Sequence, residues 1–342
     1  MRTNAARPSG PREALGFAAG LLVLAAVPAL VQDSYGRHLM VMIFIYGLLA
    51  ASWDLTLGYA GIFNFGHLAL FGVGLYTYGA LTTVAHLNPW LAFLAAGAAA
   101  GVAAVLVSVP ILRLKGIYIV LVTFGFSQLV MSIIISQSKI TGGTLGMVRI
   151  PMLPFFDHNF LRDGRLGQYY MALALLAAGV AVLRVFVRSR IGLSIVALHD
   201  NPDYAVSRGI SIARSRVITL LVSAVVAGFA GAFYGAYLRT ASVEVFSMGL
   251  STLVLSMVLL GGSRSIYGPV LASGLLTISS EAVANLGPWR PMLVALLIIG
   301  VVLVYPGGLM SLLRAASTGL GRFTGRGAPV GGEPAAVPPT AR

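Results

Sequence analysis

Residues able to do acid, base or metal chemistry are few and scattered in this chain. The five histidines stand at spacings that do not fit a metal site: His38, His67, His86, His158 and His199. There is no cysteine, which excludes disulfides, cysteine metal sites and thiol catalysis. No phosphate-binding loop of the G-x-x-x-x-G-K-[ST] type occurs, so any ATP must bind to another chain. We therefore expect no catalytic residue, no metal and no cofactor here.

Two carboxylates inside long apolar runs are the first candidates for function. Asp54 and Glu281 each lie near one end of such a run. Ionisable residues within a membrane are functional candidates by default, and a charge at the centre of a span costs about 2.5–3.5 kcal/mol. Because neither residue is central, snorkelling or local pairing explains them as well as a place on a transport path does.

A glycine-rich segment, GYAGIFNFGHLALFGVGLYTYGAL at 58–81, is the next candidate. Small residues let helices approach closely in lipid, which is one explanation. The other is a broken helix that lines a cavity at membrane depth. Under that explanation Asn64, Gly66 and His67 lie at the break.

Further polar residues interrupt the apolar sequence after this segment. Gln128 lies well inside an apolar run and needs a polar partner. Thr141, Gly142 and Gly143 form a turn, which is either a gate or an ordinary loop.

The elements that position these residues are apolar runs. Of 342 residues, 58% are hydrophobic and only 10% are charged, whereas a soluble domain has about 25% charged residues. The surplus apolar surface must face lipid, and continuous apolar runs span lipid as helices rather than as barrel strands. We predict an all-α polytopic transmembrane bundle of about ten spans, with eight as the lower bound. The runs are 15–31, 39–57, 63–85, 90–112, 117–136, 169–187, 217–238, 246–262, 267–286 and 291–305. The first resembles a signal peptide but has no clear cleavage site, so we interpret it as a span.

The net charge of +13 reflects orientation in the membrane. Lysine and arginine are concentrated in loops that share one side with the N-terminus, which predicts that both termini are cytoplasmic. No basic patch with interleaved aromatic residues occurs, so no nucleic-acid partner is expected. Membrane lipid is the expected partner of the apolar runs. We predict a cytoplasmic segment at 1–14, a transmembrane domain at 15–312 and a disordered, Gly- and Pro-rich cytoplasmic tail at 313–342.

The inner loop at 188–216 is predicted to contain two short amphipathic helices. Asn201 before Pro202 is typical of an N-cap followed by a first helical residue, and Gly209 is suited to end the second helix. The loop either rests on lipid headgroups or docks a cytoplasmic partner. The residues alone favour neither.

Six segments, taken in order, resemble the LivM-type permeases of branched-chain amino acid ABC importers. They are GYAGIFNFGHLALFGVGLY at 58–76, RLKGIYIVLVTFGFSQLV at 113–130, TGG at 141–143, RIGLSIVALHDNPDYAVSRGI at 190–210, GGSRSIYGPV at 261–270 and YPGGL at 305–309.

The resemblance implies a multi-pass permease of the bacterial inner membrane. Its partners would be a second related permease, two cytoplasmic ATPase subunits that bind ATP and magnesium, and a solute-binding protein. Residues 188–216 would form the loop that seats on an ATPase, and we call them the coupling loop. Its core positions are Gly192, Ala197, Asn201, Pro202 and Gly209. The candidate translocation path comprises Asn64, Gly66, His67, Gln128, Thr141, Gly142 and Gly143.

The sequence departs from the family pattern at several positions. Asp54 stands where relatives have Asn, and Arg264 and Ser265 stand where they have Gly and a small residue. Ala272 and Ser273 replace a usual Gly-Ala. These departures leave the solute open, because related permeases also carry urea and short amides.

An ion-coupled secondary transporter is the alternative class of protein. It would need a central charged relay, for which Asp54 and Glu281 are poorly placed.

Overall fold

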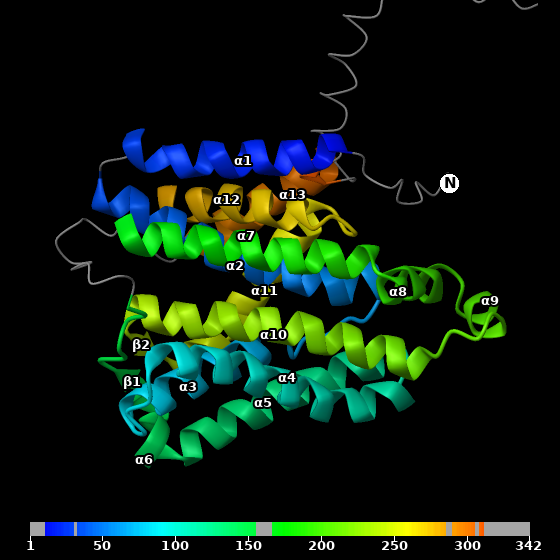
Figure 1. The fold of residues 1–342 in the computed structure, drawn as a ribbon, viewed down its shortest axis with the longest axis horizontal. Coiled ribbons are helices and arrows are strands. Elements are labelled where there is room, and N and C mark those ends of the chain that lie inside the picture. The colour runs from blue at the N-terminus through cyan, green and yellow to red at the C-terminus, as the bar shows by residue number, and fades with distance from the viewer. Residues whose placement is uncertain (1–10, 31–32, 155–165, 285–288, 305–307, 311–342) are drawn as a thin grey trace, which may run out of the picture.

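The computed structural model describes residues 11–30, 33–154, 166–284, 289–304 and 308–310. Within these ranges the chain is a bundle of roughly parallel and antiparallel helices (Figure 1). The longer helices are α1 Pro11–Leu30, α2 Ser34–Asp54, α3 His67–Thr83, α4 Pro89–Arg113, α5 Ile117–Ser136, α7 Leu166–Arg188, α10 Ile212–Leu238, α11 Met248–Gly261, α12 Tyr267–Ala282 and α13 Arg290–Val304. The shorter ones are α6 Ser138–Thr141, α8 Arg190–Asp200 and α9 Pro202–Ser207.

Every predicted apolar run overlaps one of the longer helices, which confirms the all-α class. In the described part, five helices are long and apolar enough to cross a membrane: Ser34–Tyr59, Pro89–Arg113, Ile117–Ser136, Leu166–Arg188 and Ile212–Leu238. Helices α3, α11, α12 and α13 have 17, 14, 16 and 15 residues. At 1.5 Å per residue these are shorter than the hydrocarbon core, which is about 30 Å thick.

The centre of the bundle is built on close contacts of α10 with α3 and α4. A Cβ atom at Gly74 on α3 would overlap the backbone of Gly228 on α10, and one at Gly231 would overlap the Phe71 carbonyl. Such contacts hold helices together in lipid through van der Waals packing at small residues. Small-residue packing therefore explains the second half of the glycine-rich segment.

The two ends of the bundle differ in structure (Figure 1). Helices α8 and α9 extend from one end. At the other end lie α6 and a two-stranded antiparallel ladder, in which β1 (Met147–Val148) pairs with β2 (Thr240–Ala241). This short ladder is the only sheet in the described part.

The TGG sequence is an ordered turn at the ladder end. The Thr141 hydroxyl donates to the Gln137 carbonyl at 2.9 Å, and Gly142 and Gly143 have φ values of +74° and +60°. Glycine adopts such left-handed angles without a steric cost.

Two predicted boundaries fall partly outside the described residues. Helix α1 already begins at Pro11, inside the predicted segment 1–14. The rest of that segment and the predicted tail at 313–342 lie outside the described residues.

Candidate functional site: the coupling loop and the helix break

The coupling loop contains the two predicted short helices, α8 and α9. The Asn201 side chain accepts a hydrogen bond from the backbone N–H of Tyr204 at 3.0 Å and so caps α9. Gly209 follows the second helix with a φ of +82°. The predicted cap and helix end are therefore confirmed, and local sequence was enough to find them.

Gly192 is buried, and Ala197 is partly buried. A Cβ atom at Gly192 would overlap the carbonyl oxygens of Phe186 and Val187, so this glycine permits the tight corner between α7 and α8. The Ser189 hydroxyl caps the same corner by accepting from the Gly192 N–H at 3.2 Å. A direct role of Gly192 and Ala197 in coupling stays a prediction.

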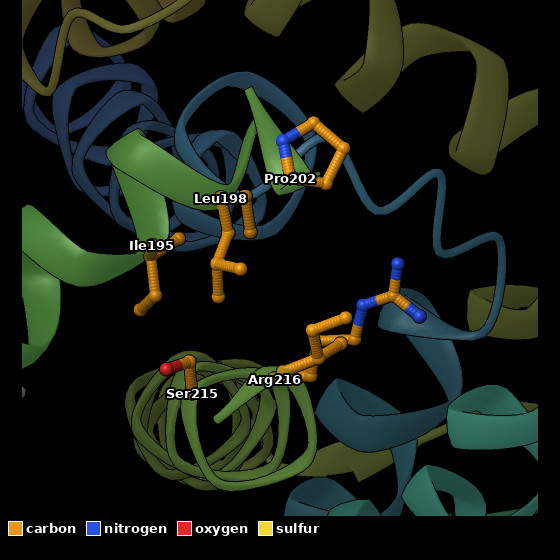
Figure 2. A pocket seen from close by; sticks show the side chains of 7 residues that line it. Ile195, Leu198, Pro202, Ser215 and Arg216 are labelled. Carbon is orange, nitrogen blue, oxygen red and sulfur yellow. The ribbon is translucent and has the colours of Figure 1, made fainter. Parts of the chain in front are cut away.

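The inner face of α8 packs toward the start of α10. Ile195 is buried, and a pocket of about 40 Å³ lies between the loop and α10 (Figure 2). Its volume is enough for a few water molecules but not for a solute. It is lined by Ala60, Ile195, Leu198, Pro202, Ile212, Ser215 and Arg216. This packing holds the loop against the bundle.

The outer face of the coupling loop carries apolar side chains that the sequence analysis missed. Leu193, Tyr204 and Val206 are 59%, 58% and 48% exposed. Once Ile195 is known to face inward, the helical period places Leu193 on the opposite side of α8. Exposed apolar side chains gathered on one ordered loop are typical of an interaction surface.

The predicted broken helix is present between α2 and α3. Helix α2 continues into a π-helical turn, Leu55–Tyr59, and residues 60–66, which we call the helix break, are not helical. π-helical turns are often found at functional sites.

The helix break contacts the coupling loop directly. The His199 ring nitrogen Nδ1 lies 3.2 Å from the Tyr59 carbonyl oxygen. A Cβ atom at Gly61, whose φ is +65°, would lie 3.0 Å from the His199 ring. The end of α8 therefore rests on the break.

Three candidate path residues come together at the break. Asn64 and His67 are completely buried, and the Gly66 N–H donates to the Asn64 side-chain oxygen at 3.0 Å. His67 Nε2 lies 2.9 Å from the Ser52 hydroxyl and its ring stacks on Trp53.

Some buried polar atoms around the break lack hydrogen bonds within the described part of the chain. They are Trp53 Nε1, Asn64 Nδ2 and His67 Nδ1. An unsatisfied buried donor or acceptor costs about 1–3 kcal/mol, so these atoms lower the stability of the folded break.

The remaining path candidates lie elsewhere. Gln128 is exposed on α5, and Thr141, Gly142 and Gly143 are at the ladder end. The structure thus gathers Asn64, Gly66 and His67 but not the full predicted set, and the path assignment stays a prediction.

The two intramembrane carboxylates have local partners. The Tyr35 hydroxyl donates to Glu281. Asp54 is completely buried and accepts hydrogen bonds from the backbone N–H groups of Ser265 at 3.0 Å and Arg264 at 3.3 Å. These contacts support the local-pairing explanation for both carboxylates. They also show that the Asp54 carboxylate contacts the backbone of both Arg264 and Ser265.

Replacing Gly61 by alanine is expected to loosen the coupling loop. The left-handed conformation costs a non-glycine residue about 1–2 kcal/mol, and the new methyl group presses on His199. We expect faster limited proteolysis within 200–212 and several-fold weaker transport. Gly116→Ala is the control, since Gly116 has a φ of +57° but no atom within 4 Å of an added Cβ. Equal proteolysis rates in the two variants would contradict the contact with His199.

A bundle of apolar helices, five of them long enough to cross a membrane in the described part, defines a multi-pass helical membrane protein. The sequence model of the family described as branched-chain amino acid transport system / permease component matches residues 37–305. The chain therefore belongs to this family of ABC importer permeases and is a multi-pass protein of the inner membrane.

Two curated relatives support the same assignment. They are the LivM permease proteins of the high-affinity branched-chain amino acid transport systems of Salmonella typhimurium (strain LT2) and Escherichia coli (strain K12). Each is 28% identical over 319 residues, which cover 87% of this chain and 75% of the relative. No solved structure matches the chain significantly.

Proposed function

We propose that this chain is one of two related permease subunits of an ATP-driven importer for branched-chain amino acids, and that its coupling loop seats one ATPase subunit. The observation that carries the proposal is the loop itself. Its inner face is packed on α10 and the helix break, while its outer face presents Leu193, Tyr204 and Val206 to solvent. A loop that only joined α7 to α10 would need neither feature.

The energy for transport comes from partner subunits. The chain has no phosphate-binding loop, so ATP and magnesium bind to the two ATPases. A solute-binding protein delivers the amino acid on the outer side. The ATPases bias the permease because they bind the coupling loop differently in their two states.

All of the longer helices cross the membrane in this proposal, giving about ten spans with both termini inside. Support comes from the packing of the chain end. Gly308, shortly after α13, lies against Gly262 in the turn between α11 and α12. That turn is joined to the end of α8 by the ion pair of Arg264 with Asp200. The end of α13 therefore lies at the coupling-loop end of the bundle.

In this proposal the second permease packs beside α5. The solute passes between the two subunits, next to the helix break. Gln128 is exposed on α5, and a side-chain amide facing lipid is costly. A polar group of a neighbouring permease, or water in the solute path, would form hydrogen bonds with this amide. Asn64, Gly66 and His67 line the inner part of the path once the break opens.

Replacing Leu193 or Val206 by arginine is expected to remove the ATPase. Each change places a charge in an apolar contact, and we expect at least about tenfold less ATPase to copurify with the tagged permease in mild detergent. Leu145→Arg is the matched control because Leu145 is 92% exposed at the ladder end. All three variants must insert and elute like wild type.

Uptake measurements then test the solute and the energy source. We expect uptake of radiolabelled leucine that persists when an uncoupler collapses the proton gradient. Uptake of urea in place of leucine would assign the chain to the urea and short-amide branch. Loss of uptake with the uncoupler, together with no ATPase copurifying with wild type, would indicate an ion-coupled carrier instead.

A further inference from the structure

The contacts of Arg264 fall on three separate elements. Its Nη2 atom lies 2.6 Å from Asp200 Oδ1 at the end of α8, in the coupling loop. Its Nε donates to the Gly58 carbonyl at 3.3 Å, in the π-helical turn before the helix break. Its backbone N–H donates to the Asp54 carboxylate at the end of α2. Arg264 itself belongs to the turn between α11 and α12, so one residue joins all these parts.

The turn holds Arg264 in a conformation that side chains other than glycine seldom adopt. Its φ is +61°. Such a conformation persists only where surrounding contacts impose it, and it is characteristic of functional positions. Here the buried Asp54 carboxylate binds the N–H groups of Arg264 and Ser265, which fixes the turn. The side chain then extends to Asp200.

Stability of the fold does not account for the ion pair of Arg264 with Asp200. The side chains of Arg264 and Asp200 are 36% and 45% exposed, and exposed ion pairs contribute little to stability. The planar guanidinium is, however, well suited to fixing two acceptors at once. The neighbouring His199 contacts the Tyr59 carbonyl directly, whereas Asp200 is connected to the π-helical turn through Arg264.

We propose that Arg264 is a positioning residue that makes the end of the coupling loop, the π-helical turn and the α11–α12 turn move as one rigid body. When an ATPase displaces the loop, this joint carries the displacement to α2, α11 and α12 and to the helix break. The proposal rests on the proposed function, since it assigns the route by which the ATPase acts on the permease.

The first test removes the joint without touching the outer face of the loop. Arg264→Gln and Asp200→Asn are assembled with the ATPases and reconstituted in proteoliposomes. We expect ATPase retention and ATP hydrolysis within twofold of wild type, and leucine uptake per ATP reduced about fivefold or more. The double variant should lose no more than Arg264→Gln alone, because Asp200→Asn removes only the ion pair that Arg264→Gln already removes. Glu244→Gln is the control and should transport normally, because Glu244 is an exposed carboxylate that follows β2 at the ladder end, away from the coupling loop.

The second test restores the joint with a covalent link. The chain has no cysteine, so Asp200→Cys with Arg264→Cys introduces the only thiols in the permease. We expect this pair to transport poorly, and a bis-methanethiosulfonate reagent that spans the two side chains to restore uptake at least threefold. A residue with a merely structural role would not respond to the link. Inhibition by the link would show that the contact must break during transport, and would overturn the proposal.

Other outcomes separate this proposal from the proposed function. If wild type transports leucine and the Arg264 and Asp200 variants match Glu244→Gln, the joint is wrong and the importer assignment stands. If these variants lose the ATPase itself, Arg264 only shapes the docking surface, and the transmission role is overturned. If wild type neither binds an ATPase nor transports, the proposed function has failed, and the joint fails with it.

Discussion

Gly231→Leu is expected to remove the folded permease from the membrane. Gly231 lies on α10 where this helix crosses α3, and even a Cβ atom there would overlap the Phe71 carbonyl. The overlap is with backbone, so no rotamer change relieves it, and the two helices must separate. Overpacking a core typically costs about 1–3 kcal/mol, and we expect a value at or above the top of this range. Fluorescence-detected size exclusion should show at least tenfold less monodisperse protein.

Gly300→Leu is the matched control for this substitution. Gly300 lies on α13, is exposed, and has no atom within 4 Å of an added Cβ. Its leucine variant should elute like wild type, since a larger apolar side chain toward lipid costs little. If Gly231→Leu gave the wild-type elution profile and thermal midpoint, the close crossing of α3 and α10 would be wrong.

Asp54→Leu is expected to have the second largest effect, on stability and transport together. The carboxylate is completely buried and accepts two backbone N–H groups from the α11–α12 turn. Without it both donors are left unsatisfied, at about 1–3 kcal/mol each. The leucine variant also avoids the desolvation cost of a buried carboxylate, which offsets part of this loss. We expect a net destabilisation of about 2–4 kcal/mol, a lower thermal midpoint and leucine uptake near background.

A graded series makes the Asp54 prediction sharper. Asp54→Asn keeps one carbonyl acceptor in place, so its loss of thermal stability should be about half that of Asp54→Leu. Asp203→Asn, on the exposed surface of α9, should leave the thermal midpoint unchanged. Equal stability of Asp54→Leu and wild type would show that the turn does not depend on this carboxylate, and would favour a place for Asp54 on the transport path.

The sequence determined the class of fold and the local structure. Apolar runs such as 117–136 had to be helices, because in lipid every backbone N–H and C=O must be satisfied within the segment, and α5 spans the same residues. Asn201 and Gly209 marked the limits of α9 because capping depends on neighbouring residues alone. The broken helix near Asn64 was one of two explanations that glycine content allowed.

Only the tertiary structure decided which residues meet. Asp54 and Arg264 are 210 positions apart, and Arg264 and Asp200 are 64 apart, so no local pattern indicates that they are in contact. The glycine-rich segment likewise served two purposes, a break at its start and close packing on α10 further along. Periodicity and capping report what a segment does with its own backbone, whereas contacts between distant segments arise only when the helices pack.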